Sequence, residues 1–123
     1  AENSRKDTLF SLDERIELAR KSLSEIENIE VIGFSGLLVD FAKELKAKVI
    51  LRGLRVVSDF EYEFQMSSMN KKLNNDIESI FLTPSESYAF LSSSLVKEIA
   101  ELGGDVSEFV SKEVKEAIQI KYK

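Results

Sequence analysis

The first third of the chain carries hydrophobic patterns that predict a helix, a strand and a second helix. Ser11-Leu12-Asp13-Glu14 has the form of a capping box, in which each outer side chain accepts from the other residue's backbone N–H. Apolar residues then follow helical spacing to about Ile26. Alternation over residues 29–33 predicts a short strand, and a second helix is expected from about Gly36. Its apolar face would consist of Leu38, Phe41 and Leu45.

The middle of the chain predicts strand, helix and strand. Residues 48–51 (KVIL) predict a buried strand, and Ser58-Asp59-Phe60-Glu61 is a second capping-box pattern that would open a helix. Residues 77–82 predict another strand, which Pro84 would end because it has no N–H for a ladder. The helix would carry an apolar stripe formed by Tyr62, Met66, Met69 and Leu73.

Glycines and charges divide the last third into two helices. One is expected after Ser92 and ends near Leu102, where Gly103-Gly104 follows. Residues 105–108 are expected to cap a final helix, whose basic end at Lys121 and Lys123 suits the negative pole of its dipole. The alternation of helices and strands predicts an α/β fold with a parallel sheet, in a single domain over residues 1–123.

Composition narrows the classes of function. With 43% hydrophobic and 32% charged residues the chain is typical of a globular protein, and its apolar runs are shorter than the ~20 residues that span a bilayer. A net charge of −5 argues against nucleic-acid binding. Without cysteine or histidine, any chemistry must use carboxylates, Lys, Arg, hydroxyls and backbone dipoles. Since there is no signal-peptide pattern, we expect a cytoplasmic protein that binds no membrane.

Two candidate anion sites stand out. Arg52-Gly53-Leu54-Arg55 follows a predicted strand, at the sheet edge where α/β proteins bind ligands. The two guanidiniums could bind phosphate, or could simply pair with Asp59, Glu61 and Glu63. Residues 92–94 (SSS) open a helix, whose amino terminus could bind phosphate, or Ser could be an ordinary cap.

The remaining candidates have simple structural readings. Lys6 precedes a helix and would be solvated, and the stripe of Tyr62, Met66 and Met69 would belong to the core. Three carboxylates near these segments would face solvent or pair with Lys and Arg, namely Glu61, Glu63 and Glu98. On these grounds the sequence supports an anion-binding α/β domain.

Four segments, in order and with matching spacing, resemble bacterial phosphopantetheine adenylyltransferases. They are residues 34–41 (FSGLLVDF), 52–70 (RGLRVVSDFEYEFQMSSMN), 88–98 (YAFLSSSLVKE) and 104–110 (GDVSEFV). The resemblance implies a Rossmann-like nucleotidyltransferase fold with a parallel sheet. It also implies transfer of the adenylyl group of ATP to 4′-phosphopantetheine, which gives dephospho-coenzyme A and pyrophosphate with Mg²⁺. A homo-hexamer and coenzyme A as a candidate feedback ligand are implied as well.

The resemblance also assigns residues to the two substrates, and it assigns no protein ligand to the metal. Lys6, Arg55 and Ser93 would stabilise charge during transfer. Phosphopantetheine would contact Lys6, Leu38, Arg52, Tyr62, Met66, Met69, Asn70 and Glu98, with Arg52 on its phosphate. ATP would contact Gly53, Leu54, Arg55, Glu63, Tyr88, Ala89, Phe90, Leu91, Ser92, Ser93 and Ser94. No protein base is needed, because a phosphate nucleophile is already ionised and catalysis consists of positioning and charge stabilisation.

The chain departs from the family in one respect. The G-x-F-D-P-x-T-x-G-H signature is missing, together with a strand–helix–strand unit of roughly 30 or more residues that carries the first two strands. We expect this chain to be a piece of a longer polypeptide. Alone, we expect it to be inactive and poorly folded, because the missing strands lie at the centre of the family's sheet.

Two other hypotheses for the function stay open. A nucleotidyltransferase that acts on nicotinamide mononucleotide or a phospho-alcohol would share the fold. An inactive remnant that binds only nucleotide or coenzyme A-like ligands would explain the absent signature.

Overall fold

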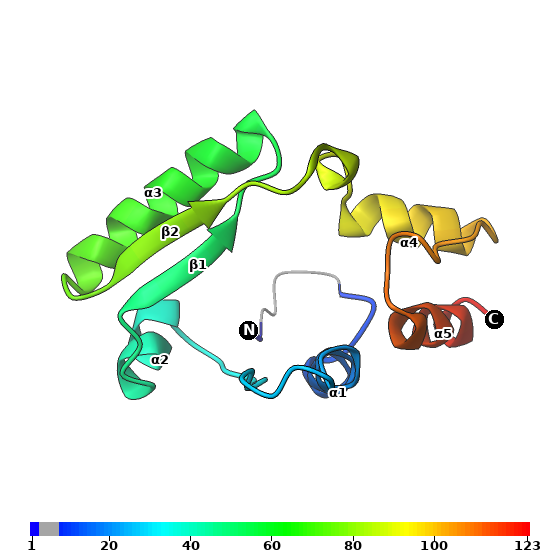
Figure 1. Cartoon of the computed structure of the whole chain (residues 1–123), viewed down its shortest axis with the longest axis horizontal. Helices are drawn as coiled ribbons and strands as arrows, with labels where there is room; N and C mark the ends of the chain where they lie inside the picture. The colour runs from blue at the N-terminus through cyan, green and yellow to red at the C-terminus, as the bar shows by residue number, and fades with distance from the viewer. Residues whose placement is uncertain (3–7) are drawn as a thin grey trace. The chain divides into compact units, whose positions relative to one another are not determined.

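The computed structural model describes residues 1–2 and 8–123, and these form two compact units. Unit 1 contains residues 1–35 and 91–123, and unit 2 contains residues 36–90. The two strands and the longest helix belong to unit 2, and three of the helices belong to unit 1 (Figure 1). A single domain over residues 1–123 stays a prediction. No helix in the described part of the chain is long and apolar enough to cross a membrane.

Unit 2 is a small α/β unit built on a parallel two-stranded sheet. Its elements are α2 (Leu38–Glu44), β1 (Val49–Gly53), α3 (Val57–Leu73), β2 (Glu78–Leu82) and a 3-10 turn, η1 (Glu86–Tyr88). β1 and β2 pair in parallel, with Arg52 opposite Phe81, and α3 runs alongside the sheet (Figure 1). The predicted α/β class with a parallel sheet is therefore confirmed.

The core of unit 2 is small and one-sided. Val39, Ala42 and Ile77 are buried, and Ile50 packs against them. Because side chains alternate along a strand, the neighbours of Ile50 point to the opposite face. Leu51 on that face is 60% exposed, so the prediction of a buried strand at residues 48–51 is wrong, although the strand itself is confirmed.

The α3 helix turns its polar side toward the sheet. Asn70 is buried and Glu63 and Ser67 are half-buried, while the apolar side chains of the helix are exposed. The predicted core stripe is therefore wrong: its members are all exposed, namely Tyr62, Met66, Met69 and Leu73. The predicted apolar face of α2, made of Leu38, Phe41 and Leu45, is also shifted by one residue. The buried residues of this helix are Val39 and Ala42, and Leu45 is half exposed.

The start of α3 differs from the predicted capping box. The helix begins at Val57, and Val56 occupies the cap position without a side-chain hydrogen bond. The Asp59 carboxylate instead accepts from the backbone N–H of Arg55 at 3.2 Å and from its Nε at 3.1 Å. An ion pair one turn away thus replaces the cap, and the helix starts two residues earlier than the pattern indicates.

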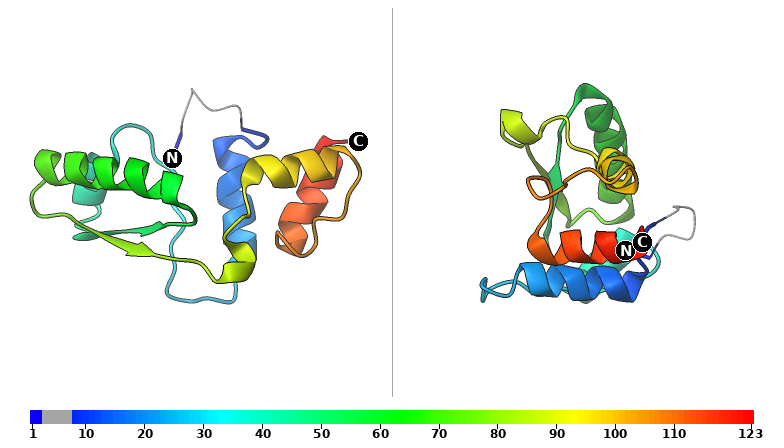
Figure 2. Two further views of the ribbon diagram at one scale, coloured as in Figure 1. Left: turned by 90° about the horizontal axis from the view of Figure 1, so that it is seen from above. Right: turned by 90° about the vertical axis from the view of Figure 1, so that its right-hand side faces the viewer.

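Unit 1 is helical. It contains α1 (Leu12–Ser22), α4 (Ser93–Glu101) and α5 (Lys112–Lys121), and α1 and α5 lie side by side (Figure 2). Its core consists of Val96, Val106 and Ile118, with half-buried apolar residues around them. The capping box at Ser11 and Glu14 is confirmed, with bonds of 2.8 and 3.2 Å.

The predicted strand at residues 29–33 is wrong. Among the described residues only β1 and β2 form a ladder, so this segment has no partner strand. Side chains of α1 hold the segment instead. Arg20 donates a hydrogen bond to the Val31 carbonyl at 3.0 Å. Ile16 packs closely against Gly33: a Cβ added to Gly33 would lie only 2.5 Å from the Cδ1 of Ile16. The α1 helix also ends at Ser22, before the predicted Ile26.

The cap of the last helix lies further along the chain than predicted. Ser111 caps α5 by accepting from Val114 N–H, and residues 105–108 precede the helix. Asp105 accepts from Ser107 and from the Lys115 ammonium at 2.8 Å, so it ties the preceding loop to α5. The end of α4 is as predicted, because Leu102 follows the helix and Gly103 adopts a φ of +78°.

Candidate functional site

A small hollow in unit 2 collects most of the residues assigned to the acceptor. Its volume is about 80 Å³, and it lies between the inner face of the sheet and the polar side of α3. Strand alternation turns Arg52 and Phe81 to this face, and the helical repeat brings α3 residues of one side to it. It is lined by Leu38, Arg52, Tyr62, Glu63, Met66, Ser67, Asn70, Ser79 and Phe81.

Arg52 and Glu63 form the charged part of this hollow. The Arg52 Nε donates to Glu63 Oε2 at 2.8 Å, and Nη2 donates to Oε1 at 2.6 Å. The Glu63 carboxylate raises the pKa of Arg52, and the guanidinium lowers the pKa of Glu63. Both groups are therefore charged at neutral pH. Arg55 likewise forms an ion pair with Asp59. In this structure both arginines therefore pair with nearby carboxylates, which is the second of the two interpretations drawn from the sequence.

Asn70 provides the other polar group of the hollow. Only 9% of the surface of Asn70 is exposed, and among the described residues Asn70 is the polar residue that is buried. Met69, its neighbour, is more than half exposed and does not line the hollow. The hollow therefore gathers an amide, a guanidinium and apolar side chains, which suits a ligand with both anionic and amide groups.

The residues assigned to ATP in unit 2 lie outside the hollow, apart from Glu63. Gly53 ends β1 and Leu54 continues its pairing, since Leu54 N–H donates to Leu82 at 2.8 Å. Tyr88 and Ala89 lie at and just after η1, and Phe90 is 84% exposed.

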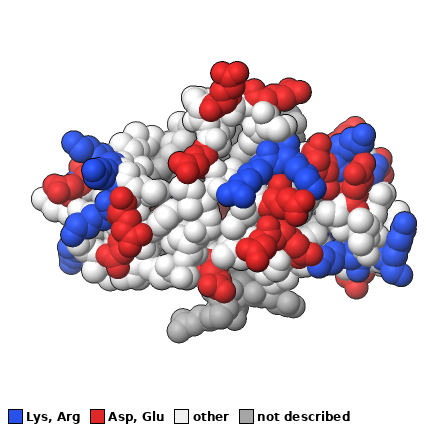
Figure 3. Space-filling view, turned by 90° about the horizontal axis from the view of Figure 1, so that it is seen from below, with Lys and Arg blue, Asp and Glu red and all other residues white. Residues whose placement is uncertain are grey.

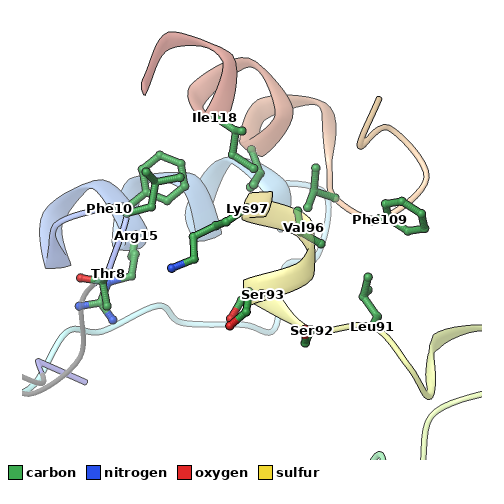
Figure 4. A pocket seen from close by; sticks show the side chains of 14 residues that line it. Thr8, Phe10, Arg15, Leu91, Ser92, Ser93, Val96, Lys97, Phe109 and Ile118 are labelled. Atoms are coloured by element: carbon green, nitrogen blue, oxygen red, sulfur yellow. The ribbon is translucent and has the colours of Figure 1, made fainter. Parts of the chain in front are cut away.

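A larger pocket lies in unit 1, beside the first turn of α4 (Figure 4). Its volume is about 740 Å³, within the size range of small-ligand sites. Residues 91–94, all assigned to ATP by resemblance, lie along one side. The described residues that line it are Thr8, Leu9, Phe10, Arg15, Leu91, Ser92, Ser93, Ser94, Val96, Lys97, Phe109, Val110, Val114 and Ile118.

The three serines differ in what they do. Ser92 is the cap of α4, because its Oγ accepts from Leu95 N–H at 3.2 Å. Ser93 and Ser94 are exposed members of the first turn, where backbone N–H groups have no partner within the helix. Ordinary capping therefore accounts for Ser92, and the other two hydroxyls face the pocket or solvent.

Sequence reasoning missed Thr8, Phe10, Arg15 and Lys97 as pocket residues. Arg15 and Lys97 are separated by most of the chain, and only tertiary packing brings α1 and α4 to one pocket. A signal existed for Lys97, which stands one turn after the serines. Glu98, assigned to the acceptor, is exposed on α4 and does not line the pocket, and Lys6 lies outside the described residues.

The charged surface shows no broad basic area on the face drawn in Figure 3. There the Lys and Arg side chains of the described residues are interspersed with Asp and Glu. Within residues 1–2 and 8–123, no three acidic side chains gather in a way that could hold a metal ion.

The chain matches the model of a known protein family. The model of the cytidylyltransferase-like family matches residues 1–99 of the 123 in the chain. The match spans the strands of unit 2 and most of α4, and so includes both the hollow and the serine turn. The chain therefore belongs to the cytidylyltransferase-like family, with a Rossmann-like nucleotidyltransferase fold and nucleotidyl transfer as its class of activity.

Proposed function

We propose that this protein is a phosphopantetheine adenylyltransferase, which transfers the adenylyl group of ATP to 4′-phosphopantetheine. The observation that carries the proposal is the hollow of unit 2. Five residues assigned to the acceptor line this one small space, although they come from α2, β1 and α3. They are Leu38, Arg52, Tyr62, Met66 and Asn70.

The chemistry of the hollow suits the acceptor. Phosphopantetheine has a phosphate at one end and two amides along its arm. Arg52 would bind the phosphate with the N–H groups that Glu63 leaves free, since a guanidinium has five donors. Asn70 would bind an amide, and Tyr62, Met66 and Leu38 would pack against the arm. A volume of about 80 Å³ accommodates only part of this ligand, so the rest would extend along the exposed side of α3.

The nucleotide would use the serine turn of unit 1. An oxygen of the acceptor phosphate would attack the α-phosphorus of ATP, the bond to the β-phosphate oxygen would break, and pyrophosphate would leave. No proton moves in this step. Ser93, Arg55 and Lys6 would stabilise the charge on the phosphoryl oxygens. Mg²⁺ would be carried mainly by ATP phosphates, as is usual for this ion.

The oligomeric state and the feedback ligand follow from the same resemblance, and the compartment is the one expected from the sequence. The protein would act in the cytoplasm as a homo-oligomer, a hexamer as in the family. Coenzyme A, which contains the pantetheine arm, would compete for the same hollow.

Turnover is the direct test. Because the 123-residue chain alone is expected to be inactive, the test uses a polypeptide that also carries the strand–helix–strand unit with the signature. It is incubated with ATP, Mg²⁺ and phosphopantetheine, and pyrophosphate release and dephospho-coenzyme A are measured. Pantetheine without its phosphate serves as the matched control, because it lacks the attacking group. We expect product with phosphopantetheine and none with pantetheine.

Three results would separate the alternatives. Pyrophosphate release with nicotinamide mononucleotide or a phospho-alcohol, and none with phosphopantetheine, would replace the proposed acceptor. Binding of both substrates without turnover would favour a remnant that only binds these ligands. If neither substrate binds in a calorimeter, the proposal is wrong.

A further inference from the structure

Among the described residues, the charged side chains that line the pocket of unit 1 are two cations, Arg15 of α1 and Lys97 of α4. No carboxylate of residues 1–2 or 8–123 joins them in the lining. This is unusual for a chain with 22 acidic and 17 basic residues. A pocket with this bias attracts anions.

Neither cation has an anionic partner among the described residues. Six other cations do form such pairs: Lys21, Arg52, Arg55, Lys71, Lys115 and Lys121. Arg15 donates only to backbone carbonyls, to Ser11 at 3.3 Å and to Ala1 at 3.1 Å. Both side chains belong to half-buried residues, so part of their hydration is lost without compensation from a carboxylate.

The pocket has a polar end and an apolar end (Figure 4). The Lys97 amine extends from α4 toward the end where Thr8 and Arg15 lie, and the Ser93 hydroxyl lies near that end as well. Val96, Leu91 and Phe109 lie toward the opposite end, while Phe10 lies next to Arg15. A ligand that combines a highly charged anion with a flat, weakly polar group would match both ends.

We propose that Arg15 and Lys97 bind the polyphosphate chain of the nucleotide and so position ATP for adenylyl transfer. The inference rests on the proposed function, and it adds two residues that the resemblance assigns to neither substrate. Arg15 would bind two phosphate oxygens through its planar fork, and Lys97 would act as a point charge. Both would be substrate-binding residues, since they would contact the phosphates of ATP that leave as pyrophosphate and not the acceptor.

Binding of inorganic tripolyphosphate, ATP and adenosine tests this directly. Lys97→Gln and Arg15→Gln remove one charge each, and calorimetry gives the dissociation constants. We expect each variant to bind tripolyphosphate and ATP about tenfold more weakly, with adenosine unaffected. The salt dependence of tripolyphosphate binding should also become shallower, because fewer charges take part.

Lys112→Gln is the matched control, since Lys112 is exposed on α5 of the same unit and does not line the pocket. Lys97→Gln is the easier variant to interpret, because Arg15 also donates hydrogen bonds to backbone carbonyls and its loss could disturb the fold. The circular-dichroism spectrum of Lys97→Gln should match that of the unaltered protein. Unchanged tripolyphosphate affinity in Lys97→Gln would overturn the inference.

The inference and the proposed function can fail separately. If the protein forms dephospho-coenzyme A and both variants keep the original Michaelis constant for ATP, only the inference fails. If tripolyphosphate binds through these residues but no adenylyl transfer occurs, the proposed function fails and the anion site stands. If neither ATP nor tripolyphosphate binds, both are wrong.

Discussion

Arg52 on β1 and Glu63 on α3 are joined by two parallel hydrogen bonds, of 2.8 and 2.6 Å. A bidentate pair fixes the plane of the guanidinium as well as its position. Glu63 has only 12% of its side chain exposed, whereas Arg52 has 46% exposed. The carboxylate thus holds the arginine from the inside and leaves its outer edge available to a ligand.

Replacement of Arg52 should remove recognition of the acceptor phosphate. Arg52→Gln should weaken phosphopantetheine binding by about 10- to 100-fold, since hydrogen bonds to charged groups contribute about 1.5–3 kcal/mol each. Arg52→Lys should give an intermediate loss, because the charge stays but the fork is lost. Calorimetry with phosphopantetheine and pantetheine measures both effects.

Arg55→Gln is the control for this prediction, because Arg55 is assigned to ATP and pairs with Asp59 instead. It should leave acceptor binding unchanged. Equal affinity of Arg52→Gln for pantetheine and phosphopantetheine is the expected signature, and a persistent preference for the phosphorylated form would contradict the role of Arg52.

The cap of α4 should contribute measurably to stability. Ser92→Ala removes the acceptor of the Leu95 N–H bond and should lower the free energy of unfolding by about 1 kcal/mol. Ser92→Gly should cost only a few tenths of a kcal/mol, because glycine also suits this position. Urea denaturation measures both. Ser94→Ala, in the same turn but exposed, should stay within about 0.5 kcal/mol, and a larger loss there would mean that Ser94 has a structural role.

Acid should weaken the connection between the loop before α5 and the helix. The Lys115 ammonium, together with the hydroxyl and backbone N–H of Ser107, holds the pKa of Asp105 well below its usual range. A carboxyl whose pKa is lower in the folded chain stabilises it above the unfolded value of about 3.9. This contribution is lost as pH falls below about 4 toward the folded pKa.

Asp105→Asn should therefore lower the urea midpoint at neutral pH and make its fall in acid shallower. Glu25→Gln is the matched control, since Glu25 is exposed in the loop after α1. A variant curve at Asp105 that parallels that of the unaltered protein down to about pH 2 would show that this ion pair does not contribute.

The core of unit 1 should be sensitive at Ile118. Its side chain is 4% exposed and packs with Val96 and Val106, so Ile118→Ala should cost about 2–5 kcal/mol. Ile120, two residues later on α5, is 71% exposed, and Ile120→Ala should change stability by about 0.5 kcal/mol at most. Urea denaturation distinguishes them. Similar losses at the two positions would mean that α5 does not bury the face described above.

Local signals predicted the elements well where the stabilising contacts are themselves local. The capping box at Ser11 involves residues three apart, and the positive φ of Gly103 follows from its place after a helix. Residues 29–33 show the limit, because alternation can identify a strand only if another strand is available to pair with it. For α3, the burial of Glu63 and Asn70 depends on Arg52 and the sheet, which helical periodicity does not contain.

The candidate site could also be predicted only in part from the sequence. The resemblance pointed to Arg52, Tyr62 and Asn70, and these residues line one hollow. Arg15 was not identifiable, since nothing near it in the chain distinguishes it from a solvated helix cation. Only the packing of α1 with α4 and α5 brings it to the same pocket as Lys97.

The pairing of Arg52 with Phe81 across the two strands also has a consequence for sequence variation. A shift of one residue in either strand would turn its side chains to the opposite face, and Arg52 would then point away from Glu63 and Asn70. Insertions or deletions within residues 49–53 or 78–82 should therefore be eliminated by selection. The turn at residues 74–76 is not part of the ladder, so natural variants of this protein should differ in size there sooner than in the strands.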